Sequence, residues 1–238
     1  MKHLFAALAL GAAALPAVSA TTLAYWDFNS DDGQVSTGSL LPSEGGGTLA
    51  LIGGAQGLFT SGSPGDPAGF PLDSGWSVGG FPAQGTASAT AGLAGLVSTV
   101  GYHQIVLSFD HKTQPSGNKW FAVEATSDAG DAWARVATFA VPAADTWSTA
   151  SFDLTAALPG LANQAGFGFR VVAIFEPGTL AYQAVEAGYN GDFGLVIDRL
   201  TVQATPVPEA GSIALALAGL AGVAGIAGRQ ARRAPCPS

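Results

Sequence analysis

The amino-acid sequence predicts an all-β domain built as a two-sheet antiparallel β-sandwich. Short runs rich in β-branched and aromatic residues recur between clusters of Gly, Pro, Asp and Ser, which is typical of strands separated by turns. No stretch between residues 21 and 204 keeps a helical period. Eight or nine candidate strands in about 185 residues suit a two-sheet sandwich.

The candidate strands follow one another along the chain, each bounded by turn residues. Ile105, Leu107 and Phe109 give the clearest alternation, and they share one face of a strand with period two. The glycine- and proline-rich stretch Gly53–Gly85 is expected to be a loop. The candidate strands are Thr22–Phe28, Thr48–Ile52, Thr86–Ala91, Gln104–His111, Trp120–Thr126, Ala134–Val141, Ser148–Leu154, Gly166–Phe175 and Gly194–Gln203.

Charge and cysteine content exclude several classes of function. The chain has 17 acidic and 9 basic residues, so no basic surface is expected and nucleic acid is excluded as a partner. Cys236 is the single cysteine, which excludes an internal disulfide framework and a cysteine-based zinc site. Between residues 21 and 204, five basic residues stand against sixteen acidic ones, a net charge of −11. Such a surface repels anionic polymers but can bind cations or neutral glycans.

Residues 1–20 have the pattern of a secretory signal peptide. A positive charge at Lys2 precedes an apolar stretch from Leu4 to Leu15, and Val18-Ser19-Ala20 supplies the small residues of a cleavage site. The protein is therefore expected to be exported through the inner membrane, with residues 21–204 as its β-sandwich domain.

Residues 205–238 contain an extended linker with a motif at 206–210, an apolar segment and a basic tail at 229–238. Gly211–Gly228 is an uncharged run of 18 residues that is expected to form a hydrophobic helix. At about 1.5 Å per residue it would reach about 27 Å, just enough for a thin bilayer. Arginines after such a span stay cytoplasmic, so the domain before it is expected to face outward.

This order of elements resembles a PEP-CTERM sorting signal. The resemblance implies that an exosortase, a membrane-embedded peptidase or transpeptidase, processes the chain after a transient stay in the inner membrane. It further implies a location in the cell envelope or extracellular matrix, with exopolysaccharide in a biofilm as a partner. A permanent single-span anchor remains open as the alternative. The residues that carry the resemblance are Val207, Pro208, Glu209, Arg229, Arg232 and Arg233.

Short motifs within residues 21–204 are similar to those of jelly-roll domains common among PEP-CTERM proteins and, more distantly, to those of carbohydrate-binding modules. They begin with Trp26-Asp27-Phe28-Asn29 and end with Ile197-Asp198-Arg199-Leu200. The similarity implies a jelly-roll-like sandwich. It implies no particular activity, because function resides in a site rather than in a fold.

No catalytic constellation is recognisable, so the protein is not expected to be an enzyme. Gly75–Gly79 matches G-x-S-x-G, but it lacks the preceding strand and following helix that a nucleophile elbow needs, and a glycine-rich loop is expected instead. His103 and His111 lie at the two ends of one predicted strand, about 26 Å apart. A hydrolase with an unrecognised site is the least favoured interpretation.

Trp120 and Trp133 are the candidate residues for stacking against a glycan. Trp120 is out of phase with Phe121 and Val123, so it is expected to face away from the core, and Trp133 could lie close to it after the turn. The favoured function is a noncatalytic exported β-sandwich protein, sorted by an exosortase-type system. A carbohydrate-binding module that uses these two tryptophans is the alternative.

One acidic residue in the last predicted strand, Asp198, shares the phase of Leu200 and is expected to face the core. A buried carboxylate must be hydrogen-bonded, paired or metal-bound. Three partners remain open: Arg170 in an ion pair, nearby backbone amides, or a structural calcium ion held together with Asp27 and Asn29. No other cofactor is expected.

Overall fold

The computed structural model describes residues 19–66 and 73–208. Residues 20–206 form one compact unit. The predicted signal peptide, up to residue 18, and the predicted sorting signal from Glu209 onward lie outside the described residues. Among the residues that are described, no helix combines the length and the apolar character needed to cross a membrane.

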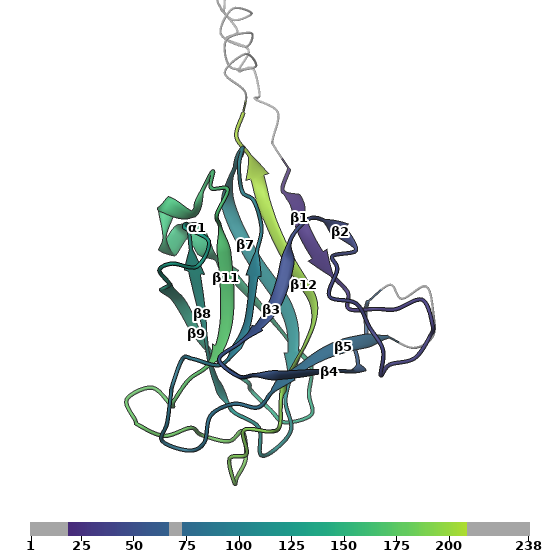
Figure 1. Ribbon diagram of the computed structural model, residues 1–238, viewed down its shortest axis with the longest axis vertical. Helices are drawn as coiled ribbons and strands as arrows, with labels where there is room; N and C mark the ends of the chain where they lie inside the picture. The colour runs from purple at the N-terminus through teal and green to yellow at the C-terminus, as the bar shows by residue number, and fades with distance from the viewer. Residues whose placement is uncertain (1–18, 67–72, 209–238) are drawn as a thin grey trace, which may run out of the picture. The chain divides into compact units, whose positions relative to one another are not determined.

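The larger sheet, sheet A, contains the first and the last strand of the domain. Its strands pair in the order β10-β7-β12-β1-β2, while β5 pairs with β12 on one side and with β4 on the other. All of these pairings are antiparallel, and β7, β12 and β1 run side by side in Figure 1. The strands are β1 (Thr21–Trp26), β2 (Glu44–Gly45), β4 (Gln56–Ser61), β5 (Ser74–Gly79), β7 (Tyr102–Lys112), β10 (Ser148–Asp153) and β12 (Leu195–Pro206).

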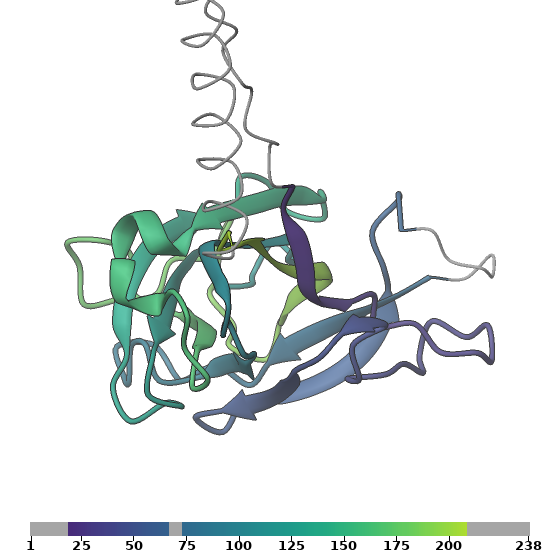
Figure 2. The same cartoon turned by 90° about the horizontal axis from the view of Figure 1, so that it is seen from above.

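The smaller sheet, sheet B, has the strand order β3-β6-β11-β8-β9, again with antiparallel pairing throughout. Figure 2 views the sandwich from above, with the core between the two sheets. A short helix α1 (Leu154–Ala157) and a 3-10 turn η1 (Pro159–Leu161) lie between β10 and β11 in the chain. The strands are β3 (Thr48–Ile52), β6 (Gly92–Leu96), β8 (Trp120–Thr126), β9 (Ala134–Ala140) and β11 (Gly168–Ala173).

Aromatic and aliphatic side chains from both sheets form one hydrophobic core. Ile105, Leu107 and Phe109 of β7 all point inward and are at most 1% exposed, as their period-two spacing predicts. Trp26 of β1 meets Phe169 of β11 edge to face, with ring centroids 6.3 Å apart. Because these two rings come from opposite sheets, they join the layers, and the predicted two-sheet antiparallel β-sandwich is confirmed.

The prediction of a loop over Gly53–Gly85 is wrong, because this stretch contains β4 and β5, which pair with each other. Gly53 and Gly54 do form a turn, with φ angles of 66° and 82°, but other glycines allow close packing within the strands. A Cβ atom at Gly57 would lie 2.6 Å from Nε1 of Trp76 on the neighbouring strand. The G-x-S-x-G sequence at Gly75–Gly79 is therefore part of strand β5 and not a glycine-rich loop.

Most strand bounds differ from the prediction by one or two residues, and two differences are larger. Ala87 and Ala89 have φ angles of 50° and 64°, in the left-handed region typical of turns, so the predicted strand Thr86–Ala91 does not form and β6 begins at Gly92. At the other end of the domain, β12 continues to Pro206 instead of ending near Gln203. The pairing of β12 with β1 ends at Ala204, whereas its pairing with β7 continues to Pro206, opposite Tyr102.

Candidate functional site

The outer face of sheet B carries both tryptophans that the sequence nominates, but at opposite ends of one strand. Trp120 starts β8 and pairs with Ala140, whereas Trp133 directly precedes Ala134, which pairs with Ala125 near the other end of β8. Five residues of strand separate the two positions, or about 16 Å. A single sugar ring does not span this distance, so only an extended chain could contact both.

Trp120 covers a small apolar cluster on the outer face. It packs against the cluster formed by Ala122, Val172 and Ile174, which are at most 4% exposed. Its indole N–H donates a hydrogen bond to Oε1 of Gln183 at 2.8 Å. Part of the Trp120 ring is therefore in contact with other residues of the domain. The side chain is half-buried, and the rest of the ring faces solvent.

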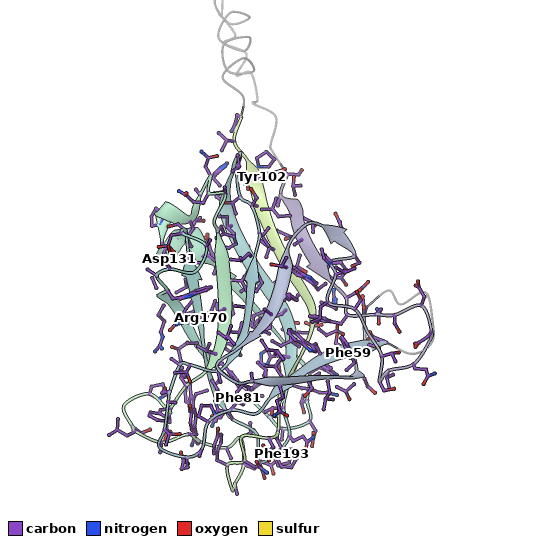
Figure 3. The ribbon with its side chains drawn as sticks, in the orientation of Figure 1. Phe59, Phe81, Tyr102, Asp131, Arg170 and Phe193 are labelled. Carbon is purple, nitrogen blue, oxygen red and sulfur yellow. The ribbon has the colours of Figure 1, made fainter. Side chains whose placement is uncertain are left out.

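Trp133 belongs to a charged cluster at the other end of the face. The guanidinium carbon of Arg170 lies 4.7 Å from the Trp133 ring centroid, in a cation–π contact. Nε of Arg170 also donates to Oε2 of Glu124 at 2.7 Å, and Nη2 of Arg135 donates to Oε1 at 3.1 Å. Glu124 is only 6% exposed, so two arginines neutralise a buried carboxylate. Arg170, labelled in Figure 3, is thus not the partner of Asp198.

The outer face of sheet A is shaped by an irregularity in β12. Asp198 and Thr201 are three positions apart, but their partners on β7, Asp110 and Ser108, are only two positions apart. The extra residue is Arg199, whose φ is 50°, so this is a β-bulge. The bulge reverses the phase of the strand, and Asp198 therefore points to the outer face rather than sharing the inward face of Leu200, which corrects the prediction.

A cavity of about 330 Å³ opens on this face, next to the bulge. Most of its lining residues carry hydroxyl, carboxylate or guanidinium groups, and they come from four neighbouring strands. The lining residues are Tyr25, Ser108, Phe109, Asp110, Thr149, Arg199 and Thr201.

Asp110 is the centre of the hydrogen bonds around this cavity. Oδ1 accepts a hydrogen bond from the hydroxyl of Thr149 at 2.6 Å, while Oδ2 accepts from the hydroxyl of Ser63 at 2.9 Å and from Nη1 of Arg199 at 3.3 Å. Ser63 also donates its backbone N–H to Oδ2 of Asp198 at 2.6 Å. The same serine thereby links two acidic side chains that lie opposite each other on adjacent strands.

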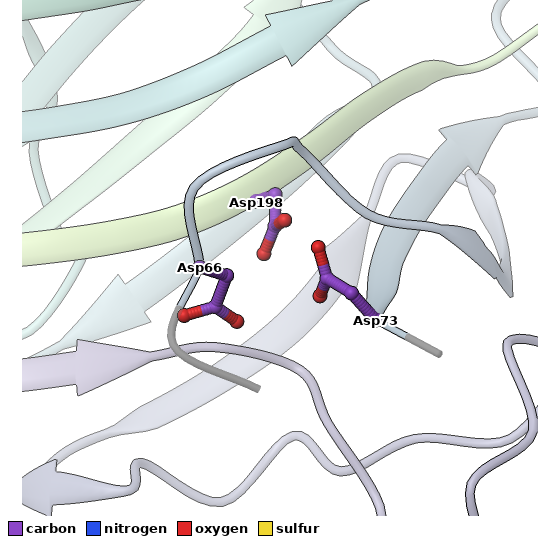
Figure 4. Close-up of side chains that lie close together, drawn as sticks. All are labelled: Asp66, Asp73 and Asp198. Atoms are coloured by element: carbon purple, nitrogen blue, oxygen red, sulfur yellow. The ribbon is translucent and has the colours of Figure 1, made fainter. Parts of the chain in front are cut away.

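Three carboxylates converge beside this network, as Figure 4 shows. One oxygen from each of Asp66, Asp73 and Asp198 lies within 4.8 Å of the others. Of the residues predicted to hold calcium, Asp198 lies in this group, whereas Asn29 donates its side-chain amide to Oδ2 of Asp66 at 2.7 Å, and Oδ1 of Asp27 accepts from the backbone N–H of Asn29. The latter two therefore support the cluster from outside.

The electrostatics of the cluster favour a bound proton or cation. Asp198 is fully buried, and this burial raises its pKa to about 7. Burial, followed by the charge of Asp66, raises the pKa of Asp73 to about 6. Among the described residues, Oδ1 of Asp73 is buried without a hydrogen-bond partner, whereas the oxygens of Asp198 accept backbone N–H groups from Ser63 and Arg199. Backbone amides are thus one partner of Asp198, and the three carboxylates supply the oxygen ligands that a hard cation prefers.

The histidines and the G-x-S-x-G serine do not form a reactive group. His111 packs against Phe109 and Phe139 in the core, and its burial lowers its pKa to about 4. His103 lies near the opposite end of β7. Ser77 sits in mid-strand on β5, paired with Leu58 and Val196. None of the three is placed beside another in the manner of a nucleophile and its base.

Sequence reasoning missed Asp66 and Asp73, because both lie in the stretch interpreted as a loop. It also missed the role of Arg199, which follows Asp198 in β12, and it missed Glu124, a single charged residue within the otherwise uncharged strand β8. That pattern is a usable signal, since a charge between buried neighbours must find a partner.

No protein-family model and no curated protein matches this chain. Among solved structures, the CBM22-1 xylan-binding domain from Paenibacillus barcinonensis Xyn10C is similar, with 11% identity, a TM-score of 0.47, and coverage of 81% of this chain and 100% of the other. A second xylan-binding CBM22 domain has 10% identity, a TM-score of 0.44, and coverage of 79% and 97%.

The K1 cleaved adhesin domain of Lys-gingipain from Porphyromonas gingivalis is also similar, with 11% identity, a TM-score of 0.36, and coverage of 69% of this chain and 100% of the other. At these values the similarity assigns neither a family nor a ligand to this chain.

Proposed function

We propose that the β-sandwich is a noncatalytic carbohydrate-binding domain whose outer sheet B face contacts a glycan chain. The observation that carries this proposal is the cluster of Trp133, Arg170, Glu124 and Arg135. It combines the indole ring of Trp133 with the hydrogen-bond donors of two arginines and the acceptor oxygens of Glu124. Contacts among these groups hold them in place. The apolar face of a sugar ring can stack on the indole, while its hydroxyl groups accept hydrogen bonds from the guanidinium groups.

The shape and charge of the domain narrow the type of glycan. Trp120 and Trp133 lie far apart on a face of small residues such as Ala122 and Ala94, which suits an extended polymer better than a small molecule. The net charge of −11 over residues 21–204 opposes binding of anionic polymers. A neutral polysaccharide is therefore the proposed ligand.

Affinity electrophoresis of the purified protein in gels containing neutral glucomannan, β-glucan or arabinoxylan, with alginate as the anionic comparison, tests this proposal. We expect retardation by a neutral polymer and a loss of at least tenfold in affinity, or about 1.4 kcal/mol, in Trp133→Ala. Trp147→Ala is the matched control, because Trp147 also makes a cation–π contact, with Lys112, but lies next to sheet A. Equal retardation of both variants would contradict the proposal, and release of reducing sugar would favour the hydrolase alternative.

We further propose that Asp66, Asp73 and Asp198 hold a structural calcium ion. Oδ1 of Asp73, which is buried and finds no hydrogen-bond donor within residues 19–66 and 73–208, supports this, because three carboxylates in one place need a compensating charge. Calcium should raise the melting temperature of the wild type by several degrees, and EDTA should reverse the effect. Asp73→Asn should abolish the response, whereas Asp131→Asn, at an exposed turn, should retain it. If calcium leaves the melting temperature of the wild type unchanged, the calcium proposal is wrong. Protons and backbone amides then compensate the negative charge of the three carboxylates.

For delivery, we propose export through the inner membrane, sorting by an exosortase and a final location in the envelope or extracellular matrix, where exopolysaccharide is the partner. This rests on the signal-peptide pattern and on the motif from Val207 onward, of which only Val207 and Pro208 lie within the described residues. Intact-mass measurement of the native protein tests it. Cleavage near Pro208-Glu209 is expected, whereas a chain that keeps residues 229–238 would indicate a permanent anchor.

A further inference from the structure

The cavity on the outer face of sheet A is separate from the Trp120–Trp133 face, because it opens on the opposite layer of the sandwich. We propose that this cavity is a second saccharide-binding site for a neutral sugar residue, and that the domain bridges two glycan chains. The bridging part of this proposal rests on the proposed function of sheet B. The sugar site itself rests on the cavity alone.

Strand register builds the floor and one wall of the cavity. Tyr25, Thr201 and Ser108 are direct neighbours across β1, β12 and β7, so their side chains form one row on the outer face. The hydroxyl of Tyr25 donates to Oδ1 of Asp66 at 2.8 Å, which holds the aromatic ring at the edge of the row. An aromatic ring beside hydroxyl groups can contact both the apolar face and the polar edge of a sugar.

The β-bulge brings the one positive charge into the cavity. In a regular strand Arg199 would share the phase of Ile197 and would point into the core, where Ile197 is fully buried. A non-glycine residue at φ 50° is uncommon, and bulges recur beside functional sites because they redirect a side chain. Oδ1 of Asp198 accepts the backbone N–H of Arg199 at 2.7 Å and so stabilises the bulge.

The hydrogen-bonding groups of the cavity are only partly used. A guanidinium group has five N–H donors, and within the described residues Arg199 shows one side-chain hydrogen bond, the 3.3 Å contact with Asp110. Asp110 accepts from three groups and has about four acceptor positions. Donors therefore outnumber acceptors, but both are present, as the hydroxyl groups of a sugar require.

Size and charge point to a neutral sugar rather than to an anion. The cavity volume of about 330 Å³ lies at the lower end of the range of small-molecule sites, roughly 300–1,000 Å³, which suits one sugar residue or a chain end. Asp110 already neutralises Arg199, and Asp66 and Asp198 lie close by. A carboxylated or sulfated ligand would meet this surplus of negative charge, whereas a neutral polyol would not.

Isothermal titration of the full chain with xylotetraose, cellotetraose and mannotetraose tests the second site. We expect two binding events in the wild type for at least one probe, and one event in Ser108→Leu, which fills the cavity from an outward strand position. Gln203→Leu is the control, because it adds a leucine to the outer face of the same sheet, on β12 and outside the lining residues. Arg199→Lys keeps the charge but loses the planar fork, and should weaken the second event about tenfold. Melting temperatures of all variants check folding.

The outcomes separate the two proposals. If Trp133→Ala removes all binding and Ser108→Leu removes none, the sheet A site is refuted and the proposed function stands. If Ser108→Leu removes all binding and Trp133→Ala removes none, the sheet A site stands and sheet B is not the binding face. Absence of any binding event in the wild type with all three probes refutes both. Bridging predicts that wild-type protein raises the viscosity of a bound neutral polysaccharide, and that neither single-site variant does.

Discussion

The outer faces of the two sheets handle charge in opposite ways. On sheet B, Glu124 is balanced by Arg135 and Arg170, so the charges satisfy one another. On sheet A, Asp110 pairs with Arg199, and three further acids lie close by, namely Asp66, Asp73 and Asp198. In the first arrangement the charged groups pair with one another, whereas in the second one buried carboxylate oxygen has no partner in the part of the chain that the structure describes.

This difference in charge balance indicates that the outer face of sheet B is rigid, whereas the outer face of sheet A responds to its surroundings. A closed ion network holds Trp133 in one position, as a stacking surface requires. An incompletely compensated acid cluster makes the structure around Arg199 depend on protons, cations or ligands, because each of these lowers the cost of buried negative charge.

The largest loss of stability is expected from Glu124→Ala, which removes the carboxylate that neutralises two arginines on sheet B. The free energy of unfolding should fall by about 3 kcal/mol, at the lower end of the roughly 3–5 kcal/mol of buried pairs because Arg135 is partly solvated. Urea denaturation measures this change, with Asp131→Ala at an exposed turn as the control. Equal stability of the two variants would show that the network does not contribute to folding.

A similarly large loss of stability is expected on acidification, because His111 lies in the core on the inner face of sheet A. Burial lowers the pKa of His111 from 6.5 to about 4, while the charge of Asp110 acts against this shift. The unfolded chain therefore binds the extra proton first, so the His111 contribution is fully present above pH 6.5 and is lost as the pH falls toward 4, on the order of 3 kcal/mol.

His111→Phe should remove this contribution while preserving the aromatic contacts with Phe109 and Phe139. The raised pKa values of Asp198 and Asp73 act in the opposite direction, since their contribution to stability falls as the pH rises from about 4 to about 7. The comparison between wild type and His111→Phe isolates the histidine. If both lose stability equally between pH 6.5 and 4.5, His111 does not titrate as described.

A smaller effect should distinguish the two tryptophans of sheet B. Trp120→Ala uncovers the apolar cluster of Ala122, Val172 and Ile174, so unfolding free energy should fall by about 2 kcal/mol, below the value for a fully buried ring. Trp133→Ala loses chiefly a cation–π contact and should cost less than about 1 kcal/mol. Chemical denaturation of both variants, set beside their glycan affinities, would show whether stability and binding are divided between the two ends of β8.

The smallest effect is expected from Arg135→Ala. Its side chain is 46% exposed and Glu124 keeps Arg170, so stability should fall by only about 0.5 kcal/mol. Measurement at low and high salt checks the reason, because an exposed pair is screened and the difference should shrink. A salt-independent loss above 2 kcal/mol would instead indicate that Arg135 packs on the sheet.

Residue pattern alone predicted most of the strands, because period-two alternation depends only on neighbours in the chain. Thr48–Ile52 and Trp120–Thr126 form with the predicted boundaries. The period-two pattern did not predict a strand where close packing of the backbone, rather than side-chain alternation, determines the structure. In β5, glycine-rich sequence forms a strand because Trp76 and its neighbours need close backbone approach.

By itself, the sequence determined the fold class, the net negative charge and the presence of a buried acid at Asp198, since these follow from composition and local spacing. Only the tertiary structure decided what that acid meets. One extra residue at Arg199 reverses the phase of β12, and residues more than a hundred positions away, Asp66 and Asp73, come to lie beside Asp198. Such contacts depend on strand pairing between distant segments, and local periodicity carries no information about that pairing.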